Sequence, residues 1–224
     1  MLSLMDLIRR QSRRDYTLHS RQKKSWFNAI LFFLFIISFF PLTLPADPTL
    51  LRILAPSVIW IAVLFSILLS VERLLQADYE DGIIEQWLVC GYPLTPLVIA
   101  KVAVHWGLIL IPMLVLSPVL AFLYGLTLHE TGIVIASLVC GTPTVMLLCA
   151  MAAAFSTTLQ QKGVLMGLIV LPLTVPIMIL GSATLNAAMD GLVVKGYLAC
   201  LSALSCLAIA GVPFAMTAAL RENG

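Results

Sequence analysis

The residues best suited to chemistry lie in one polar stretch of the chain, Glu72–Trp87, which reads ERLLQADYEDGIIEQW. Five of its first 14 residues are carboxylates, at Glu72, Asp78, Glu80, Asp81 and Glu85. Clustered carboxylates can hold divalent metal ions, or they can pair with cationic groups on another protein. The first possibility requires further acids at suitable spacing, and the second requires a surface that faces water.

Metal-dependent catalysis is not supported by the positions of the acids. Membrane phosphotransferases that join alcohols to nucleotide-activated lipids begin with Asp-Gly and hold metals with further aspartates along two helices. Asp81-Gly82 supplies such a start, but after Glu85 no acid appears until Glu130. The metal cage cannot be completed. We therefore expect no catalytic residue and no metal site in this chain.

The same stretch is amphipathic when it is placed on a helix at 100° per residue. An apolar stripe recurs every four residues, at Leu75, Tyr79, Ile83 and Trp87. Carboxylates occupy a neighbouring face, at Asp78, Asp81 and Glu85. Gly82 interrupts the middle, where glycine costs roughly 1 kcal/mol relative to alanine. We expect two short helical pieces with a hinge at Gly82.

This amphipathic stretch is predicted to dock a cytosolic protein. Its carboxylates cannot lie in lipid, because each costs about 2.5–3.5 kcal/mol at the centre of a membrane helix. The alternative is a solvated loop on the bilayer surface. That alternative explains the apolar stripe, but acids are repelled by anionic headgroups. An apolar stripe flanked by negative charge fits a socket on another protein better.

A second candidate site lies inside an apolar stretch, where His105 is followed by Trp106 and preceded, four residues earlier, by Lys101. An ionisable residue within the membrane is a functional candidate, and imidazole can ligate haem iron. The alternative is a neutral histidine hydrogen-bonded across helices. We treat His105 and Trp106 as candidate substrate-binding residues. His129 and Glu130 are predicted in an outer joint, either solvated or touching an extracytoplasmic partner.

Two kinds of motif are absent from the sequence. The five cysteines form no Cys-x-x-Cys pair and no Cys-x-x-Cys-His, so neither a metal clasp nor covalent haem attachment is indicated. No G-x-x-x-x-G-K-[ST] loop occurs, so the chain lacks the usual cradle for ATP phosphates. If ATP drives this protein, another polypeptide holds the ATP.

The elements that position these residues are membrane helices. The chain is 61% hydrophobic and only 11% charged, against about 25% charged in an ordinary soluble domain. About 20 apolar residues suffice to cross a bilayer as a helix. We predict an all-α membrane protein with one domain, residues 1–224, and six spans at Trp26–Leu44, Leu54–Val71, Leu97–Tyr124, Ile133–Phe155, Val164–Leu180 and Gly196–Leu220. Because Pro172 and Pro176 shorten the fifth span, Gly181–Met189 is expected to form a brief separate helix on the outer face.

The distribution of basic residues predicts the orientation. Seven of the 13 basic residues lie in the first 24 positions, where residues 1–24 are expected to form an amphipathic helix in the membrane interface. Lys and Arg near a span favour the cytoplasmic side. Six crossings then place both termini in the cytoplasm. They also place residues 72–96, between the second and third spans, on that side as a coupling segment.

An ordered set of motifs resembles the haem exporter B family, the membrane permease subunit of the ABC-type apparatus for cytochrome c maturation. The motifs are Phe40-Pro41-Leu42, Pro56 with Ile59-Trp60, Glu72-Arg73-Leu74, Asp78-x-x-Asp81-Gly82-x-x-Glu85-Gln86, Ala100-Lys101 with His105-Trp106, Ser117-Pro118, Gly141-Thr142-Pro143-Thr144, Leu171-Pro172-Leu173-Thr174 with Pro176, Gly196-Tyr197-Leu198, and Pro213-Phe214-Ala215 with Leu220-Arg221. Single motifs are weak, but the ordered set over some 180 residues is specific.

The resemblance implies a six-span permease of the ABC exporter type in the bacterial inner membrane. The expected partners are a separate ATPase subunit holding ATP and Mg²⁺, a haem-handling membrane subunit and a small helper subunit. A periplasmic haem chaperone is an indirect partner, membrane lipid surrounds the spans, and no nucleic acid is expected. The residues matching the ATPase-coupling segment are Asp78, Tyr79, Glu80, Asp81, Gly82, Ile83, Glu85, Gln86 and Trp87.

The resemblance leaves the cargo open. The family's tryptophan-rich haem signature belongs to partner subunits, and the four tryptophans here are dispersed, so no cofactor is expected on this chain itself. Haem is a possible cargo. Either the bundle moves haem across the bilayer, or it relays an ATP-driven change to the haem-handling partner so that the chaperone is loaded and released. An ABC permease for a different small molecule and a polytopic membrane enzyme are the alternatives.

Overall fold

The computed structural model describes residues 23–44, 47–71, 74, 82–83, 89, 93–156 and 162–222. These residues form helices and their connections, and no strand occurs among them. The helices are α2 (Lys23–Thr43), α3 (Pro48–Val71), α6 (Leu94–Val115), α7 (Ser117–Tyr124), α8 (Leu128–Ser156), α9 (Lys162–Met189) and α10 (Lys195–Glu222). The predicted interfacial helix, residues 1–24, lies almost wholly outside these ranges.

Among the described residues, five stretches of helix are long and apolar enough to cross a membrane. They are Pro48–Val71, Leu94–Val115, Leu128–Phe155, Val170–Met189 and Lys195–Leu220. The apolar part of α2, Phe27–Thr43, is shorter. The prediction of an all-α membrane protein is therefore confirmed. The count of six crossings and the cytoplasmic placement of both termini stay predictions.

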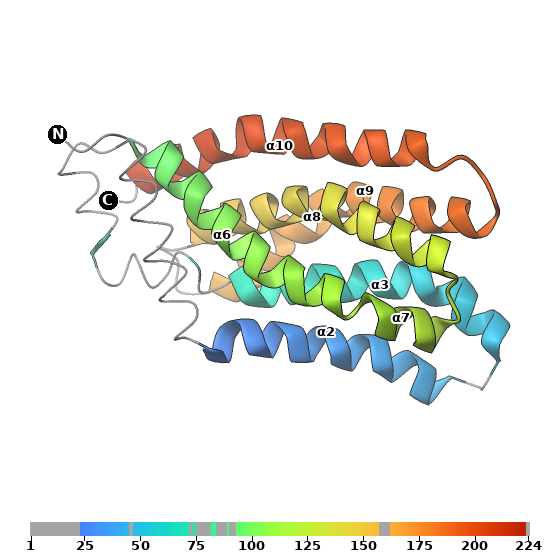
Figure 1. Cartoon of the computed structure of the whole chain (residues 1–224). Helices are drawn as coiled ribbons and strands as arrows, with labels where there is room; N and C mark the ends of the chain where they lie inside the picture. The colour runs from blue at the N-terminus through green and yellow to red at the C-terminus, as the bar shows by residue number, and fades with distance from the viewer. Residues whose placement is uncertain are drawn as a thin grey trace.

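The helices form an elongated bundle in which successive long helices of the chain run in opposite directions (Figure 1). The start of α2, the end of α3, the start of α6 and the end of α10 all lie at one end of the bundle (Figure 1). The chain between Val71 and Leu94 is thus anchored at the end where the described chain begins and finishes. This arrangement agrees with a coupling segment on the same side as the two termini.

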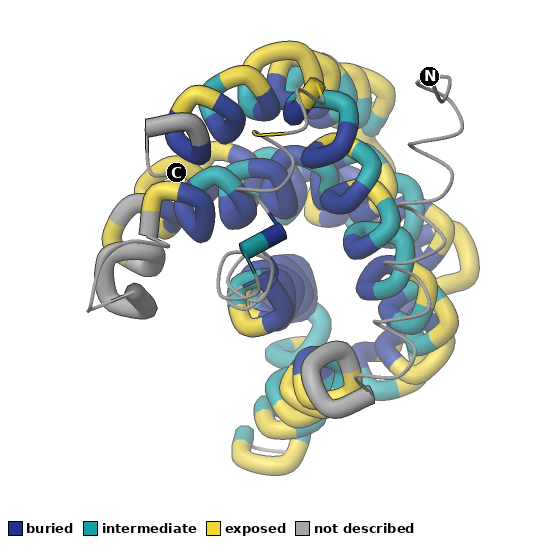
Figure 2. The backbone as a smooth tube through the Cα atoms, turned by 90° about the vertical axis from the view of Figure 1, so that its left-hand side faces the viewer, coloured by how far each residue is buried: buried dark blue, intermediate teal, exposed yellow. Residues whose placement is uncertain are grey.

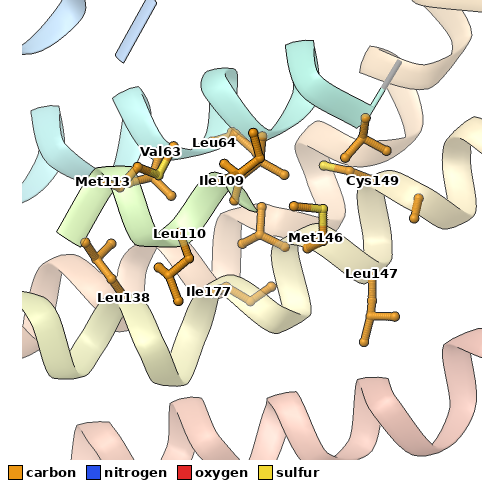
Figure 3. Packing of buried hydrophobic residues seen from close by; sticks show 14 of the residues in the cluster. Val63, Leu64, Ile109, Leu110, Met113, Leu138, Met146, Leu147, Cys149 and Ile177 are labelled. Atoms are coloured by element: carbon orange, nitrogen blue, oxygen red, sulfur yellow. The ribbon is translucent and has the colours of Figure 1, made fainter. Parts of the chain in front are cut away.

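Helix α8 occupies the middle of the bundle and packs against α3, α6, α7, α9 and α10. In the most apolar stretch of α8, 67% of the residues are buried. In that of α10 only 22% are buried, so α10 lies at the periphery. Figure 2 shows the same contrast, with buried backbone facing inward and exposed backbone on the outside. The core between α3, α6, α8 and α9 is filled by aliphatic side chains such as Leu64, Ile109, Leu138 and Ile177 (Figure 3).

The third predicted span, Leu97–Tyr124, is one apolar stretch but two helices. Helix α6 ends at Val115, and α7 starts at Ser117 after the shared cap Leu116. The cause is Pro118, whose ring clashes with the carbonyl one turn earlier and which has no N–H to donate. Helix α7 ends at Gly125, where a φ of +62° favours glycine.

The fifth span was predicted wrongly. Helix α9 runs without interruption from Lys162 to Met189, so Gly181–Met189 is not a separate brief helix. Pro172 and Pro176 are exposed, so their rings displace no neighbouring helix. The Thr174 hydroxyl donates to the carbonyls of Val170 (2.9 Å) and Leu171 (3.1 Å), which helps to hold the backbone there.

The first span shows how one internal proline is accommodated. Pro41 lies inside α2 and cannot donate to the carbonyl of Ile37, four residues earlier. The phenolic hydroxyl of Tyr124, at the end of α7, donates to that carbonyl at 2.9 Å. A side chain from another helix thus replaces the missing backbone donor. It also ties α7 to α2.

Candidate functional site

Most of the predicted ATPase-coupling residues lie outside the described part of the structure. They are Asp78, Tyr79, Glu80, Asp81, Glu85, Gln86 and Trp87. Gly82 and Ile83 are described. Gly82 lies in a turn with a φ of +67°, a conformation that favours glycine, and Ile83 is buried in the apolar core. The docking surface and the hinge stay predictions.

The second candidate site lies within the bundle, on α6. His105 is only 2% exposed, and its Nε2 lies 3.1 Å from the hydroxyl oxygen of Ser70 on α3. One turn earlier, Lys101 is also buried. His105 is therefore hydrogen-bonded across helices, which was the alternative to a direct contact with cargo. The imidazole is buried in the present packing, and a role of His105 and Trp106 in substrate binding stays a prediction.

Trp106 points to a different helix. Its indole Nε1–H donates to the hydroxyl of Thr142 on α8 at 2.9 Å, and that hydroxyl donates to the carbonyl of Leu138 at 2.6 Å. The two predicted substrate-binding residues are thus consecutive on α6, but His105 contacts α3 and Trp106 contacts α8. Their partners Ser70 and Thr142 were not identified from the sequence as site residues. The signal that could have identified them is a hydroxyl residue flanked by apolar residues within a predicted span.

The stretch Gly141–Thr144 of α8 is where three other helices meet. The indole of Trp60 on α3 lies so close to Gly141 that an added Cβ would come within 2.6 Å of its ring. Thr142 accepts from α6, as described above. On α10, the Ser205 hydroxyl lies 2.9 Å from that of Thr144 and donates to the carbonyl of Cys140. Pro143 lies inside the helix at this level.

A polar cluster occupies the opposite end of the bundle from the coupling segment. Arg52 in the first turns of α3 forms an ion pair with Glu130 and also donates to the carbonyl of Gly125 at 2.8 Å. Glu130 is 4% exposed, so the expectation of a solvated carboxylate is wrong. Its neighbour His129 is exposed. An ion pair between distant positions could not be recognised from their spacing.

Glu130 is buried because it also caps α8. Its second carboxylate oxygen accepts from the N–H of Thr127 at 2.8 Å, while the Thr127 hydroxyl accepts from the N–H of Glu130 at 3.3 Å. This reciprocal pair is a capping box, for which Thr-x-x-Glu is the sequence signature. The cluster therefore joins the end of α7, the start of α8 and the start of α3.

The described residues contain no group of three or more His, Cys, Asp or Glu side chains that could hold a metal ion. The cysteines among them, Cys140, Cys149, Cys200 and Cys206, are free thiols. What the described geometry offers is a set of side-chain hydrogen bonds between helices.

Comparisons with known proteins cover almost the whole chain. The family model described as CcmB protein matches residues 5–223. A protein named Heme exporter protein B from Pseudomonas aeruginosa is 38% identical over 208 residues, 93% of each chain. Its namesake in Escherichia coli (strain K12) is 42% identical over 194 residues, 87% of this chain and 88% of the relative. That from Bradyrhizobium diazoefficiens is 35% identical over 224 residues, 100% of this chain and 99% of the relative. With the helical membrane bundle already described, these matches show that the chain belongs to the CcmB protein family.

Proposed function

We propose that this chain is the membrane permease subunit of an ABC transporter complex for cytochrome c maturation. The observation that carries the proposal is the similarity to proteins named Heme exporter protein B over nearly the whole chain. The five long apolar helices support a multi-pass membrane subunit. The complex couples ATP hydrolysis to haem export, or to loading and release of a periplasmic haem chaperone.

The chain is a non-catalytic subunit in this proposal. Its sequence has no phosphate-binding loop, so ATP and Mg²⁺ are assigned to a separate ATPase subunit. A haem-handling membrane subunit and a small helper subunit complete the assembly. The name of these relatives, Heme exporter protein B, supports haem as the cargo of the complex. The resemblance to the haem exporter B family supports the inner membrane as the location, and the distribution of basic residues supports cytoplasmic termini.

The coupling mechanism is mechanical. ATP-dependent closure of the ATPase pulls on Asp78–Trp87, through charge pairing at its carboxylates and apolar anchoring at Tyr79 and Trp87, while Ile83 packs in this chain's own core. Helices α3 and α6 precede and follow this segment in the chain, since α3 ends at Val71 and α6 begins at Leu94. A displacement of the segment therefore moves the ends of two helices whose side chains reach α8 in the middle of the bundle.

Charge reversal tests the docking surface. Asp81→Lys combined with Glu85→Lys is expected to leave membrane insertion intact and to abolish co-purification of the ATPase subunit, because opposite charges become like charges. Asp190→Lys is the matched control, since Asp190 is an exposed carboxylate beyond the end of α9, at the other end of the bundle. Undiminished co-purification of the double variant would remove the docking surface from the proposal.

The orientation is tested by cysteine labelling in a chain whose native cysteines are replaced by serine. A membrane-impermeant maleimide is expected to label His129→Cys in intact cells, because His129 is exposed at the outer end. Asp81→Cys is expected to react only after the inner membrane is opened. The reverse pattern would place the coupling segment in the periplasm, where no ATPase could reach it.

A further inference from the structure

Two consecutive residues of α6 place ring nitrogens within hydrogen-bond distance of hydroxyls on two different helices. The His105 Nε2 lies 3.1 Å from the Ser70 oxygen on α3, and the Trp106 Nε1 lies 2.9 Å from the Thr142 oxygen on α8. Consecutive side chains on an α-helix point about 100° apart. Helix α6 is therefore held in two directions at one level of the bundle.

The direction of both bonds follows from the number of protons on a hydroxyl, which is one. The Ser70 hydroxyl donates its proton to the carbonyl of Ile67 at 2.8 Å. With that proton on the Ile67 carbonyl, the Ser70 oxygen can only accept toward His105, and this arrangement requires the tautomer of His105 that carries a proton on Nε2. Thr142 acts in the same way toward Trp106, because its own proton goes to Leu138.

A protonated Nε2 has consequences for haem. Iron is bound by the lone pair of an unprotonated imidazole nitrogen. While the bond to Ser70 stands, Nε2 has no lone pair to offer. Ser70 and His105 are also 1% and 2% exposed, so a macrocycle could not approach this nitrogen without moving α3 away from α6.

The bond lies at a mechanically sensitive place. Helices α3 and α6 are not among the pairs whose backbones pack closely, so side chains carry their connection. Ser70 is the penultimate residue of α3, immediately before the coupling segment. A pull on that segment therefore acts on Ser70 before it reaches any residue deeper in the helix.

We infer that Ser70 is a positioning residue that holds the His105 ring in its Nε2–H form and links the end of α3 to α6. The inference rests on the proposed function for its transport consequence, but its structural part does not. Motion of the coupling segment lengthens or breaks this bond, and α6 then moves with Trp106 still bound to α8.

The structural part is tested by nitrogen NMR on the full chain in lipid nanodiscs. The chain contains three histidines, so His19→Gln and His129→Gln leave His105 as the only one, with ¹⁵N-labelled imidazole. We expect a protonated, hydrogen-bonded Nε2. Ser70→Ala should shift that signal, Ser70→Thr should restore it, and Thr142→Val should leave it in place. An unprotonated Nε2 in the parent chain, or an unchanged signal in Ser70→Ala, would overturn the inference.

The functional part is tested in the reconstituted complex. Side-chain hydrogen bonds between membrane helices shift equilibria by roughly 3-fold on average and about 20-fold at most. Ser70→Ala is expected to lower haem-chaperone loading by a factor in that range while the ATPase still co-purifies, and Ser70→Thr to restore it. Normal loading by Ser70→Ala contradicts the link. Loss of ATPase binding by the parent chain would instead contradict the proposed function and leave the NMR result standing.

Discussion

The indole of Trp60 on α3 lies directly against Gly181 on α9, so closely that a Cβ at position 181 would come within 1.9 Å of the ring atom Cε2. The same ring also meets Gly141 on α8. Trp60 is 2% exposed and is the largest side chain buried to this degree. Two glycines on different helices thus form the slot for one tryptophan, and small residues at such contacts let membrane helices approach closely.

Gly181→Ala is therefore expected to destabilise the bundle strongly. Overpacking typically costs about 1–3 kcal/mol, and a contact this short on a rigid ring belongs at the upper end. The free energy of unfolding, measured by titrating SDS into mixed micelles, should fall by about 3 kcal/mol. Gly132→Ala is the matched control, since a Cβ there meets nothing within 4 Å. Equal effects of the two substitutions would contradict the slot.

A smaller side chain at position 60 should relieve the same clash. Trp60→Leu alone removes packing atoms and leaves space in the slot, whereas Trp60→Leu with Gly181→Ala fills part of that space with the new methyl group. The two changes are in contact, so their costs should not add. We expect the double variant to be destabilised by less than the sum of the single variants. Strict additivity would show that the two sites do not touch.

Arg52 and Glu130 provide a third prediction, concerning the end of the bundle where α3 and α8 begin. Glu130→Gln retains a side-chain oxygen for the capping box but removes the ion pair, whereas Arg52→Ala leaves a buried carboxylate without its cation. Breaking a fully buried pair costs about 3–5 kcal/mol, and the Arg52 side chain is 35% exposed, so we expect about 2 kcal/mol for Arg52→Ala. Glu130→Gln should cost less.

The readout is again the free energy of unfolding, now for both variants at low and high salt. A partly buried pair is screened less than a surface pair, so the cost of Arg52→Ala should change little with ionic strength. If Glu130→Gln proves as costly as Arg52→Ala, the unpaired carboxylate is not the source of the loss. The capping interaction would then carry the effect.

Asp47, just before α3, provides a prediction for pH. Its carboxylate accepts from the Thr49 hydroxyl at 2.7 Å and from the Thr49 N–H at 2.9 Å, and these bonds lower the pKa of Asp47 below its usual 3.8. A carboxyl whose pKa is lower in the folded state stabilises that state above its unfolded pKa. This contribution is lost as the pH falls from about 4 through the folded pKa.

Carboxyl-carbon NMR of labelled aspartate measures that pKa directly. Thr49→Val removes the hydroxyl, which is the first cause of the shift, and should raise the pKa of Asp47 toward 3.8. In thermal melts, the stability advantage of the native chain over Asp47→Asn should shrink as the pH drops below about 4. An advantage that persisted or grew at lower pH would have the wrong sign for a lowered pKa.

The sequence predicted the helices well because length and hydrophobicity alone determine which segments can cross a bilayer. It predicted the helix ends poorly wherever proline was involved. Pro172 and Pro176 suggested a short span, yet α9 continues because exposed rings displace nothing. Pro118 lay within a single predicted span, yet it divides that span into two helices. Whether a neighbour compensates for a missing N–H depends on tertiary contacts that no local pattern contains.

The candidate site was predicted in part for a similar reason. His105 and Trp106 attracted attention because polar rings are rare in apolar stretches. Their hydroxyl partners, on other helices, are common residues with no distinctive spacing. The burial of Glu130 was missed because the cation that pairs with it, Arg52, lies on another helix and far away in the chain. Residue types indicated which groups needed partners, but only the packing of helices showed which partners they found.

The last prediction concerns the donor that replaces the N–H missing at Pro41. Tyr124→Phe removes the hydroxyl that donates to the Ile37 carbonyl and leaves that acceptor, buried in the bundle, without its partner. Such a loss costs about 1–3 kcal/mol. In a Pro41→Ala background the backbone N–H of residue 41 returns, so Tyr124→Phe should there cost nearly nothing. A double-mutant cycle on the free energy of unfolding measures the difference, with Phe122→Leu as a control at an exposed position of the same helix. If Tyr124→Phe costs the same with and without Pro41, the hydroxyl does not serve as the substitute donor, because its value would then be independent of the bond that the proline removes.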